Sequence, residues 1–398
     1  MRLSAPFPVL FFASAAHAMN HVLLALYLTL VLVIGPSWHL SYAEMIALWA
    51  PGAMLVGLGA PLTGWLGDRW GETRVLILCF LGLGSSAVLA GFSHSVFALE
   101  GALALLGFSG AIYHPVGIPW VVKHARLRGR AIASTGIAGS FGVAAGPVVA
   151  GGLATLAGWR AGFIVPGLIA LAIGAALAWF HFSGRIVDRR DDAHVHHAPP
   201  SRADMTRTFA TLGVTMTVSL IINSGFGTAL PKLVQIGTSL GSYGFFAIGV
   251  AVGAIQLAGS SAQFAGGHFA DRGAAKRGYI LGLLASALVL PLVAISSGWL
   301  LAAAAIAAIF LFEWTAPIET LFMARYTPPS RRGLVFGIRY GLAAIGTPLG
   351  VWLVSRLYDP NAGFIYLLTA LAGFALLGMA AALFLPADKK SELPAAAE

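Results

Sequence analysis

A doubled pattern of long apolar segments constrains this chain most, because similar residues recur at a nearly constant spacing of about half the chain. The most distinctive run ends in Asp68-Arg69 between two apolar segments, and its copy ends in Asp271-Arg272 in the same setting. Three further pairs keep nearly the same spacing: Pro115 with Pro317, Gly136 with Gly337, and Pro147 with Pro348. Internal repetition of this kind predicts two structural halves built to one plan.

The composition indicates that lipid surrounds most of the chain. Of the 398 residues, 58% are hydrophobic and only 10% are charged, which leaves too few polar side chains to cover a water-soluble globule. A membrane-spanning helix needs about 20 mainly apolar residues. Twelve such stretches are present, near residues 6–33, 44–66, 74–92, 96–122, 131–156, 161–182, 208–230, 242–267, 277–296, 299–324, 333–355 and 362–385.

The sequence therefore predicts an all-α membrane protein with twelve transmembrane helices in two pseudo-symmetric six-helix bundles. Residues 1–183 form the first bundle, 184–207 a linker and 208–398 the second bundle. The predicted linker is polar, contains Pro199-Pro200, and carries a short group of acidic and histidine residues: Asp191, Asp192, His194, His196 and His197. That group has the side chains of a metal site, but we interpret it as a solvated linker, because a flexible segment holds ligands poorly.

The N-terminus has some features of a cleaved secretory signal, namely Arg2, a short apolar run and a run of small residues. We interpret it as the first transmembrane helix instead. Apolar sequence continues to Ile34, and Asn20 has a counterpart at Asn223 in the second half.

The positions of the basic residues predict the orientation. If the chain starts inside, all but four of its 24 Lys and Arg residues lie on the cytoplasmic side, so both termini are expected there. The exceptions are Arg160, Lys232, Arg356 and the intrahelical Arg339. Topology thus accounts for the net charge of +9, and we expect no nucleic-acid partner. Cys79 is the one cysteine, which excludes an intrachain disulfide and a cysteine metal site.

The loop that contains Asp68 resembles a known family signature. Gly64-x-Leu66-Gly67-Asp68-Arg69-x-Gly71-x-x-Arg74 is similar to the signature loop of the major facilitator superfamily, and the run ending in Asp271-Arg272 is its degenerate copy. The resemblance implies two bundles that rock about a central cavity, with Asp68, Arg69, Arg74, Asp271 and Arg272 as gating residues. Such contacts would form only when the cytoplasmic side is closed. Glu72 stands where the family usually has a basic residue.

Two further motifs carry resemblances within this superfamily. Gly142-x-x-x-Gly146-Pro147 is similar to the proline-glycine motif of its antiporters, and Pro348 is the matching proline of the second half. Ordinary small-residue packing explains these four residues equally well. His17-Ala-Met-Asn20-His21 and Tyr113-His114-Pro115 resemble motifs of the fosmidomycin-resistance-type efflux branch, although His21 and Val116 replace acidic residues of that branch. This second resemblance implies small-molecule efflux in a bacterial inner membrane.

Intramembrane polar residues are the candidate site residues, because they are costly to bury in lipid. His17 and His21 are four positions apart with Asn20 beside them, so we expect these three on one helix face. They can bind an anion, relay protons or ligate a metal, and a packing role is an equal alternative. The correspondence of Asn20 and Asn223 favours a face directed toward the cavity.

Two acidic residues in one predicted helix have different expected roles. Glu319 and Arg339 lie at similar depth, so we expect them to form an ion pair; alternatively, Arg339 contacts an anionic substrate and Glu319 acts as its gate. Glu313 lies on a different face of the helix, near the middle of the membrane. We interpret Glu313 as a proton carrier, with His114 of the first half as its partner.

These features predict a secondary active transporter that moves a small organic molecule, anionic or drug-like, by proton-coupled efflux. The alternative is export of a divalent transition metal or metal chelate through His17, His21 and His114. An enzyme is not expected, because neither a nucleophile with its base nor a phosphate-binding loop is recognisable. We expect no cofactor, the bilayer and the substrate as partners, and a monomer.

Overall fold

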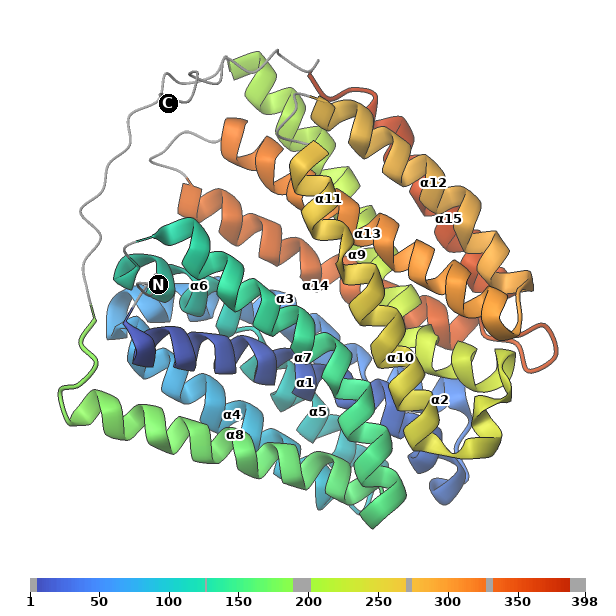
Figure 1. Ribbon diagram of the computed structural model, residues 1–398, viewed down its shortest axis with the longest axis horizontal. Helices are drawn as coiled ribbons and strands as arrows, with labels where there is room; N and C mark the ends of the chain where they lie inside the picture. The colour runs from blue at the N-terminus through green and yellow to red at the C-terminus, as the bar shows by residue number, and fades with distance from the viewer. Residues whose placement is uncertain (1–5, 126, 189–201, 270–273, 327–331, 387–398) are drawn as a thin grey trace.

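The computed structural model describes residues 6–125, 127–188, 202–269, 274–326 and 332–386. These residues form a helical protein in two halves (Figure 1). The first half contains α1 (Phe7–Trp38), α2 (Tyr42–Ala47), α3 (Ala50–Trp70), α4 (Glu72–Gly91), α5 (Val96–Gly110), α6 (Tyr113–His124), α7 (Arg128–Ala157) and α8 (Trp159–Phe182). The second half contains α9 (Arg202–Gly237), the 3-10 helix η1 (Ser239–Tyr243), α10 (Phe245–Ser260), α11 (Ala262–Phe269), α12 (Ala275–Ile295), α13 (Gly298–Tyr326), α14 (Arg332–Leu357) and α15 (Ile365–Ala382).

The predicted all-α membrane fold is confirmed. Each of the twelve predicted stretches coincides with one helix or with two consecutive helices, the pairs being α2 with α3, α5 with α6, and α10 with α11. Within the described residues, ten helical segments are long and apolar enough to cross a membrane, and α10 is a shorter apolar helix. The helices are lined with large exposed apolar side chains, such as Phe97 and Trp299, as expected for surfaces that face lipid.

Close packing within each half depends on glycine. In the first half α7 lies against α1, where a Cβ atom on Gly142 would lie 2.4 Å from the Ala18 carbonyl oxygen. In the second half α14 lies against α9, where a Cβ on Gly350 would lie 2.7 Å from the Ile221 carbonyl oxygen. The corresponding helices of the two halves therefore use the same small-residue contact.

The helices of the two halves meet at one end and diverge toward the other (Figure 1). We call the end where α8 ends and α9 begins the linker side, and the opposite end the far side. On the far side, the Tyr42 hydroxyl donates to the Thr228 carbonyl oxygen at 3.1 Å, and the Tyr42 ring packs on Tyr358 and Phe364. Across the two halves, α7 packs on α10 and α3 packs on α14. These contacts close the far side.

Both ends of the predicted linker, residues 184–207, contact the helical halves. Ile186 is buried, and Asp188 accepts hydrogen bonds from Thr73, so the start of the predicted linker packs on the first half. At its other end α9 already begins at Arg202, and Arg207 donates to the Phe384 carbonyl oxygen. Polar side chains at both ends of the predicted linker thus contact neighbouring helices, so ordered structure continues beyond the apolar stretches. Residues 189–201, with the predicted linker histidines, lie outside the described part of the chain.

Candidate functional site

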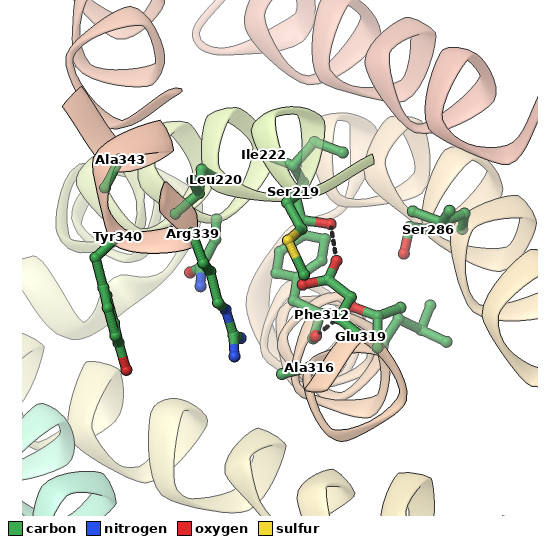
Figure 2. Close-up of a pocket in the computed structure, with 15 residues that line it drawn as sticks. Ser219, Leu220, Ile222, Ser286, Phe312, Ala316, Glu319, Arg339, Tyr340 and Ala343 are labelled. Carbon is green, nitrogen blue, oxygen red and sulfur yellow. Dashed lines mark hydrogen bonds between the residues drawn. The ribbon is translucent and has the colours of Figure 1, made fainter. Parts of the chain in front are cut away.

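A pocket of about 190 Å³ lies in the second half, where it borders the first. Its walls come from α9, α12, α13 and α14, and Figure 2 shows the lining side chains. The lining is mostly apolar, with hydroxyl, amide and charged groups at a few positions: Ser219, Asn223, Ser286, Thr315, Glu319, Arg339 and Tyr340. An apolar pocket with a few convergent polar groups is the usual form of a small-molecule site.

Glu319 projects from α13 and is buried, with 5% of its surface exposed. Its Oε1 atom accepts a hydrogen bond from the Ser219 hydroxyl at 3.0 Å (Figure 2) and another from the Tyr279 hydroxyl at 2.6 Å. Ser219 comes from α9 and Tyr279 from α12, so three helices converge on this carboxyl group. Glu319 was predicted from the sequence, but Ser219 and Tyr279 were not, because their separation from Glu319 along the chain gives no signal of contact.

Arg339 does not form the predicted ion pair with Glu319 in this structure. Its Nη1 atom donates instead to the Thr320 hydroxyl at 3.0 Å, while hydroxyl groups solvate Glu319. Both residues line the same pocket, in agreement with their similar depth. Depth alone does not determine in which direction each side chain leaves its helix. Arg339 therefore lines the pocket as a cation with a neutral hydrogen-bond partner.

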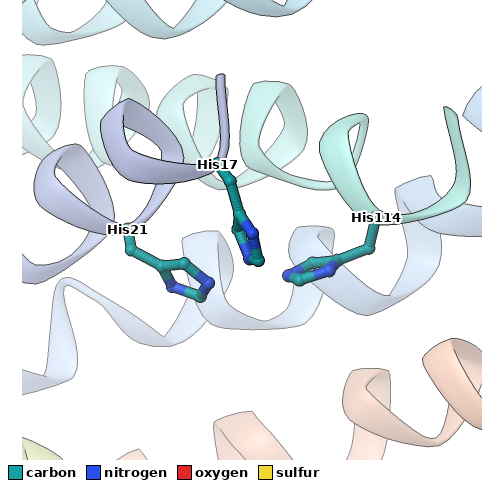
Figure 3. A group of neighbouring side chains, drawn as sticks. All are labelled: His17, His21 and His114. Atoms are coloured by element: carbon teal, nitrogen blue, oxygen red, sulfur yellow. The ribbon is translucent and has the colours of Figure 1, made fainter. Parts of the chain in front are cut away.

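The three predicted intramembrane histidines lie together on the first half. His17 and His21 of α1 and His114 of α6 point toward one another (Figure 3), and one nitrogen of each ring lies within 4.8 Å of the others. Nδ1 of His17 lies 2.8 Å from the Thr135 carbonyl oxygen; since a carbonyl only accepts, this nitrogen carries the proton. Nδ1 of His114 is buried and has no hydrogen-bond partner.

One aromatic contact connects the histidines with the pocket. The His114 ring stacks on the ring of Tyr340, with 5.4 Å between centroids and 20° between planes. Tyr340 lines the pocket from α14. Trp314 does not line it: its indole nitrogen donates to the Gly278 carbonyl oxygen at 3.0 Å, and its ring packs on Phe269.

The two repeat-related asparagines occupy different environments, contrary to the expected common orientation. Asn223 is exposed and lines the pocket. Asn20 is buried, its Oδ1 has no partner, and it lies near Gly110 of α5, where an added Cβ would be 3.3 Å away. The two asparagines thus keep corresponding positions along their helices, but the Asn20 side chain lies beside Gly110 inside the first bundle.

Glu313 lies outside the pocket lining. Its carboxylate accepts a hydrogen bond from the side-chain amide of Gln263, on α11, at 2.6 Å. The expectation that Glu313 and Glu319 occupy different faces of α13 is thus matched by their different partners. His114, the partner expected for Glu313, contacts His17, His21 and Tyr340 instead.

The loop between α3 and α4 turns at Gly71, where φ is +92° and a side chain would be strained. Asp68, Arg69 and Arg74 are exposed on the linker side, and Arg69 lies over the Trp65 ring at 5.6 Å. Their predicted gating partners, Asp271 and Arg272, lie outside the described residues. Glu72, the residue that departs from the signature, is buried and forms an ion pair with Lys123 of α6.

The predicted packing residues lie at close contacts between helices. Gly142 and Gly146 face α1, and the carbonyl oxygen of Pro147 would be 2.2 Å from a Cβ on Gly249 of α10. Pro348 lies inside α14, and the Thr347 carbonyl oxygen accepts a hydrogen bond from Ser224 at 2.8 Å. Pro147 therefore belongs to the contact between the halves, and Pro348 to the packing within the second.

Parts of this chain are similar in sequence to parts of several bacterial transport proteins. The multidrug efflux pump LfrA of Mycolicibacterium smegmatis is 36% identical over 116 residues, which are 28% of this chain and 22% of that protein. The probable 4-methylmuconolactone transporter of Cupriavidus pinatubonensis is 33% identical over 146 residues, 34% of each chain. The tetracenomycin C resistance and export protein of Streptomyces glaucescens is 30% identical over 184 residues, 43% of this chain and 33% of that protein. The matched segments thus span about a third or less of each relative.

Solved structures share the fold over nearly the whole chain. A bacterial homolog of the human lysosomal transporter Spinster, in an inward-facing and occupied conformation, superimposes with a TM-score of 0.72 at 13% identity and covers 97% of this chain and 95% of its own. The peptide transporter POT superimposes with a TM-score of 0.73 at 15% identity, covering 95% and 93%. In sequence, residues 10–272 and 212–398 match the family model, and the chain therefore belongs to the Major Facilitator Superfamily.

Proposed function

We propose that this chain exports small, mainly apolar organic molecules across the bacterial inner membrane in exchange for protons. The observation that carries the proposal is the pocket in which the buried carboxyl group of Glu319 faces an otherwise largely apolar lining. The descriptions of relatives as a multidrug efflux pump and as a resistance and export protein support the outward direction. The resemblance to the fosmidomycin-resistance-type branch remains part of this proposal.

Glu319 is our first candidate for the proton-binding group. Its partners are hydroxyl groups rather than a cation, and a buried carboxylate without a paired cation is costly to keep charged. A substrate that carries positive charge, or donates a hydrogen bond, competes with the proton for this carboxyl group. Competition of this kind is what exchange of substrate for proton requires, because each ligand must leave before the other binds.

Alternating access supplies the conformational step of the proposal. The far side is closed by Tyr42 and by the crossings of α7 with α10 and of α3 with α14. If both termini are cytoplasmic, this is the state that loads substrate from the cytoplasm. Asp68, Arg69 and Arg74, now exposed, would then join Asp271 and Arg272 in closing the linker side.

Arg339 supports a second candidate function, the transport of a small organic anion. Its guanidinium lines the same pocket, and no carboxylate among the described residues forms an ion pair with it. The two candidates predict opposite signs of coupling. An anion bound at Arg339 would favour a protonated Glu319, so that substrate and proton move in the same direction, whereas a cation or a hydrogen-bond donor at Glu319 excludes the proton.

Transport in proteoliposomes with an internal pH indicator tests both candidates. Ethidium is the apolar aromatic cation and salicylate the aromatic carboxylate. We expect ethidium flux to drive protons in the opposite direction, and Glu319→Gln to abolish that movement, while Glu100→Gln, a carboxyl group outside the pocket, leaves it intact. Salicylate flux that carries protons in the same direction and is lost in Arg339→Gln would favour the anion transporter. Absence of flux for both compounds would contradict the proposal.

The same assay compares the two acidic residues of α13. Glu313 is hydrogen-bonded to Gln263 outside the pocket. It therefore acts as a second proton-binding group on the proton path rather than as a substrate ligand. We expect Glu313→Gln to reduce proton movement while ethidium binding is retained. Full proton-coupled transport by Glu313→Gln would remove this residue from the path, and the same result for His114→Ala would remove its expected partner.

A further inference from the structure

The arrangement of the three histidines matches the donor set of a metal centre. The ring centroids of His17, His21 and His114 lie 4.9, 5.2 and 5.6 Å apart. Around a tetrahedral Zn²⁺ with Zn–N bonds of about 2.1 Å, neighbouring imidazole centroids are expected about 5 Å apart. The spacing of the ring centroids therefore fits three imidazoles that share one metal ion.

The hydrogen-bond partners of the rings support the same chemistry. Nδ1 of His17 donates to the Thr135 carbonyl oxygen at 2.8 Å, which leaves the lone pair of Nε2 free in the neutral ring. Metal-binding histidines commonly use one nitrogen for the metal and donate the other to a carbonyl or carboxylate. Nδ1 of His114 is buried with no partner, a state that costs free energy until a ligand occupies it.

The surroundings hold the cluster in place. The His17 ring stacks on Tyr113, with 4.4 Å between centroids. On the other side it lies against the backbone of Gly139 in α7, where an added Cβ would be 2.5 Å from the ring. Because two helices supply the donors and a third supplies a close-fitting wall, the three rings are held on rigid elements rather than on a loop.

We propose that His17, His21 and His114 bind one divalent transition-metal ion of the Zn²⁺ type, with its fourth coordination position open toward the cavity between the halves. Three neutral imidazoles suit Zn²⁺ and related borderline ions better than Mg²⁺ or Ca²⁺, which prefer oxygen ligands. Ligating nitrogens around a tetrahedral Zn²⁺ lie about 3.4 Å apart, whereas those of the cluster lie within 4.8 Å. Metal binding would therefore require the rings to turn so that their nitrogens approach one another.

His114 is the member of the cluster that contacts the second half. Tyr340 of α14 stacks on His114, and Arg339 lies close enough for its charge to interact with that ring. A bound metal ion would therefore offer its free position to an anionic or neutral oxygen ligand rather than to another cation. The site is independent of the proposed export function, because metal binding requires neither flux nor a proton gradient.

Titration of the purified full-length protein with ZnCl₂ by calorimetry tests the proposal, together with Co²⁺ absorption as a report of coordination geometry. The protein carries no histidine tag, and His194, His196 and His197 are replaced by Gln to remove competition from the linker. We expect one Zn²⁺ per chain, four-coordinate Co²⁺ bands, and at least a tenfold loss of affinity in His17→Ala, His21→Ala and His114→Ala. The exposed His39, replaced by Asn, is the matched control and should bind as the background protein does.

Two results would overturn the proposal. One is the absence of Zn²⁺ binding by the background protein, and the other is binding that the three alanine variants leave unchanged. Melting temperatures of each variant without metal verify that the protein is folded, and His114→Gln provides a second, more conservative replacement. Ethidium transport is measured separately, in the presence of a chelator. Ethidium transport without Zn²⁺ binding would contradict the metal site alone, whereas Zn²⁺ binding without ethidium transport would contradict the export proposal alone.

Discussion

His114 and Tyr340 form a stacked pair that joins α6 of the first half to α14 of the second. His114 belongs to the histidine cluster and Tyr340 lines the pocket, so the pair connects the two. Aromatic pairs contribute about 0.5–1.5 kcal/mol beyond the area that they bury. A change in the relative position of the halves must therefore break this contact or carry it along.

Replacement of Tyr340 by Leu tests whether the pair stabilises the state with the far side closed. Loss of about 1 kcal/mol corresponds to a roughly fivefold change in a two-state population, so we expect the population with the far side open to rise by about that factor. Spin labels at Phe97→Cys and Trp299→Cys, in a Cys79→Ala background, report the far-side distance; these side chains are 84% and 92% exposed, so labels there disturb little packing. Tyr340→Phe keeps the ring and should behave as the parent protein, and equal distance distributions in all three proteins would refute this role.

The ion pair between Glu72 and Lys123 predicts that loss of one partner destabilises the protein more than loss of both. The side chains are 7% and 23% exposed, and removal of one partner leaves a buried charge without compensation, which costs about 3 kcal/mol or more. We therefore expect Lys123→Met to lower the unfolding temperature clearly. Addition of Glu72→Gln to that variant removes the isolated charge and should restore most of the loss. If the double variant is as unstable as the sum of the two single variants, the pair does not stabilise this end of the bundle.

This ion pair also shows how far sequence reasoning reaches. Apolar runs and the repeat predicted the helices and their grouping, because lipid forces each span to satisfy its own backbone. The loop motif lies at the junction of α3 and α4, and Glu72 was recognised as a departure from the signature. Its partner was not found, because Lys123 comes from another helix and no periodic pattern connects the two positions.

The candidate site was predictable in composition but not in contacts. Cost of burial identified the histidines, Glu313, Glu319 and Arg339 as special. The three histidines gather in one cluster, and Glu319 and Arg339 line one pocket. The rotation of each helix decided the rest: it turned Glu319 toward Ser219 and Tyr279 and turned Glu313 toward Gln263. Such rotations depend on the packing of neighbouring helices, which a single sequence does not specify.

Asp359 predicts a pH effect on the far-side loop between α14 and α15. Its carboxylate accepts hydrogen bonds from the backbone amides of Ala362, at 2.9 Å, and Asn361, at 2.7 Å, and these bonds lower the pKa of Asp359 below its usual range. Because the folded state favours the ionised form, the stabilisation is complete above the ordinary aspartate pKa of about 3.9. It is lost as the pH falls through the lowered value.

The measurement is amide hydrogen exchange of this loop at pH 7 and at acidic pH. We expect Asp359→Ala to increase exchange at Asn361 and Ala362 at pH 7, where the parent carboxylate is ionised. At a pH below the lowered pKa the variant and the parent should differ little once the intrinsic exchange rates are corrected. A constant difference across the pH range would show that the carboxylate charge is not responsible.

Gly249 provides the sharpest test of the contact between the halves. A Cβ at this position would lie 2.2 Å from the carbonyl oxygen of Pro147, a backbone atom that cannot rotate away. Gly249→Ala must therefore separate α10 from α7, and overpacking of this kind costs about 1–3 kcal/mol. Since the clash exists only while these helices are in contact, we expect the variant to favour the far-side-open state in the spin-label experiment and to slow transport.

Gly373→Ala is the matched control, because nothing lies within 4 Å of its added Cβ and alanine in a helix is about 0.5–1 kcal/mol more favourable than glycine. Equal behaviour of the two variants would mean that the crossing of α7 and α10 does not determine which side is closed.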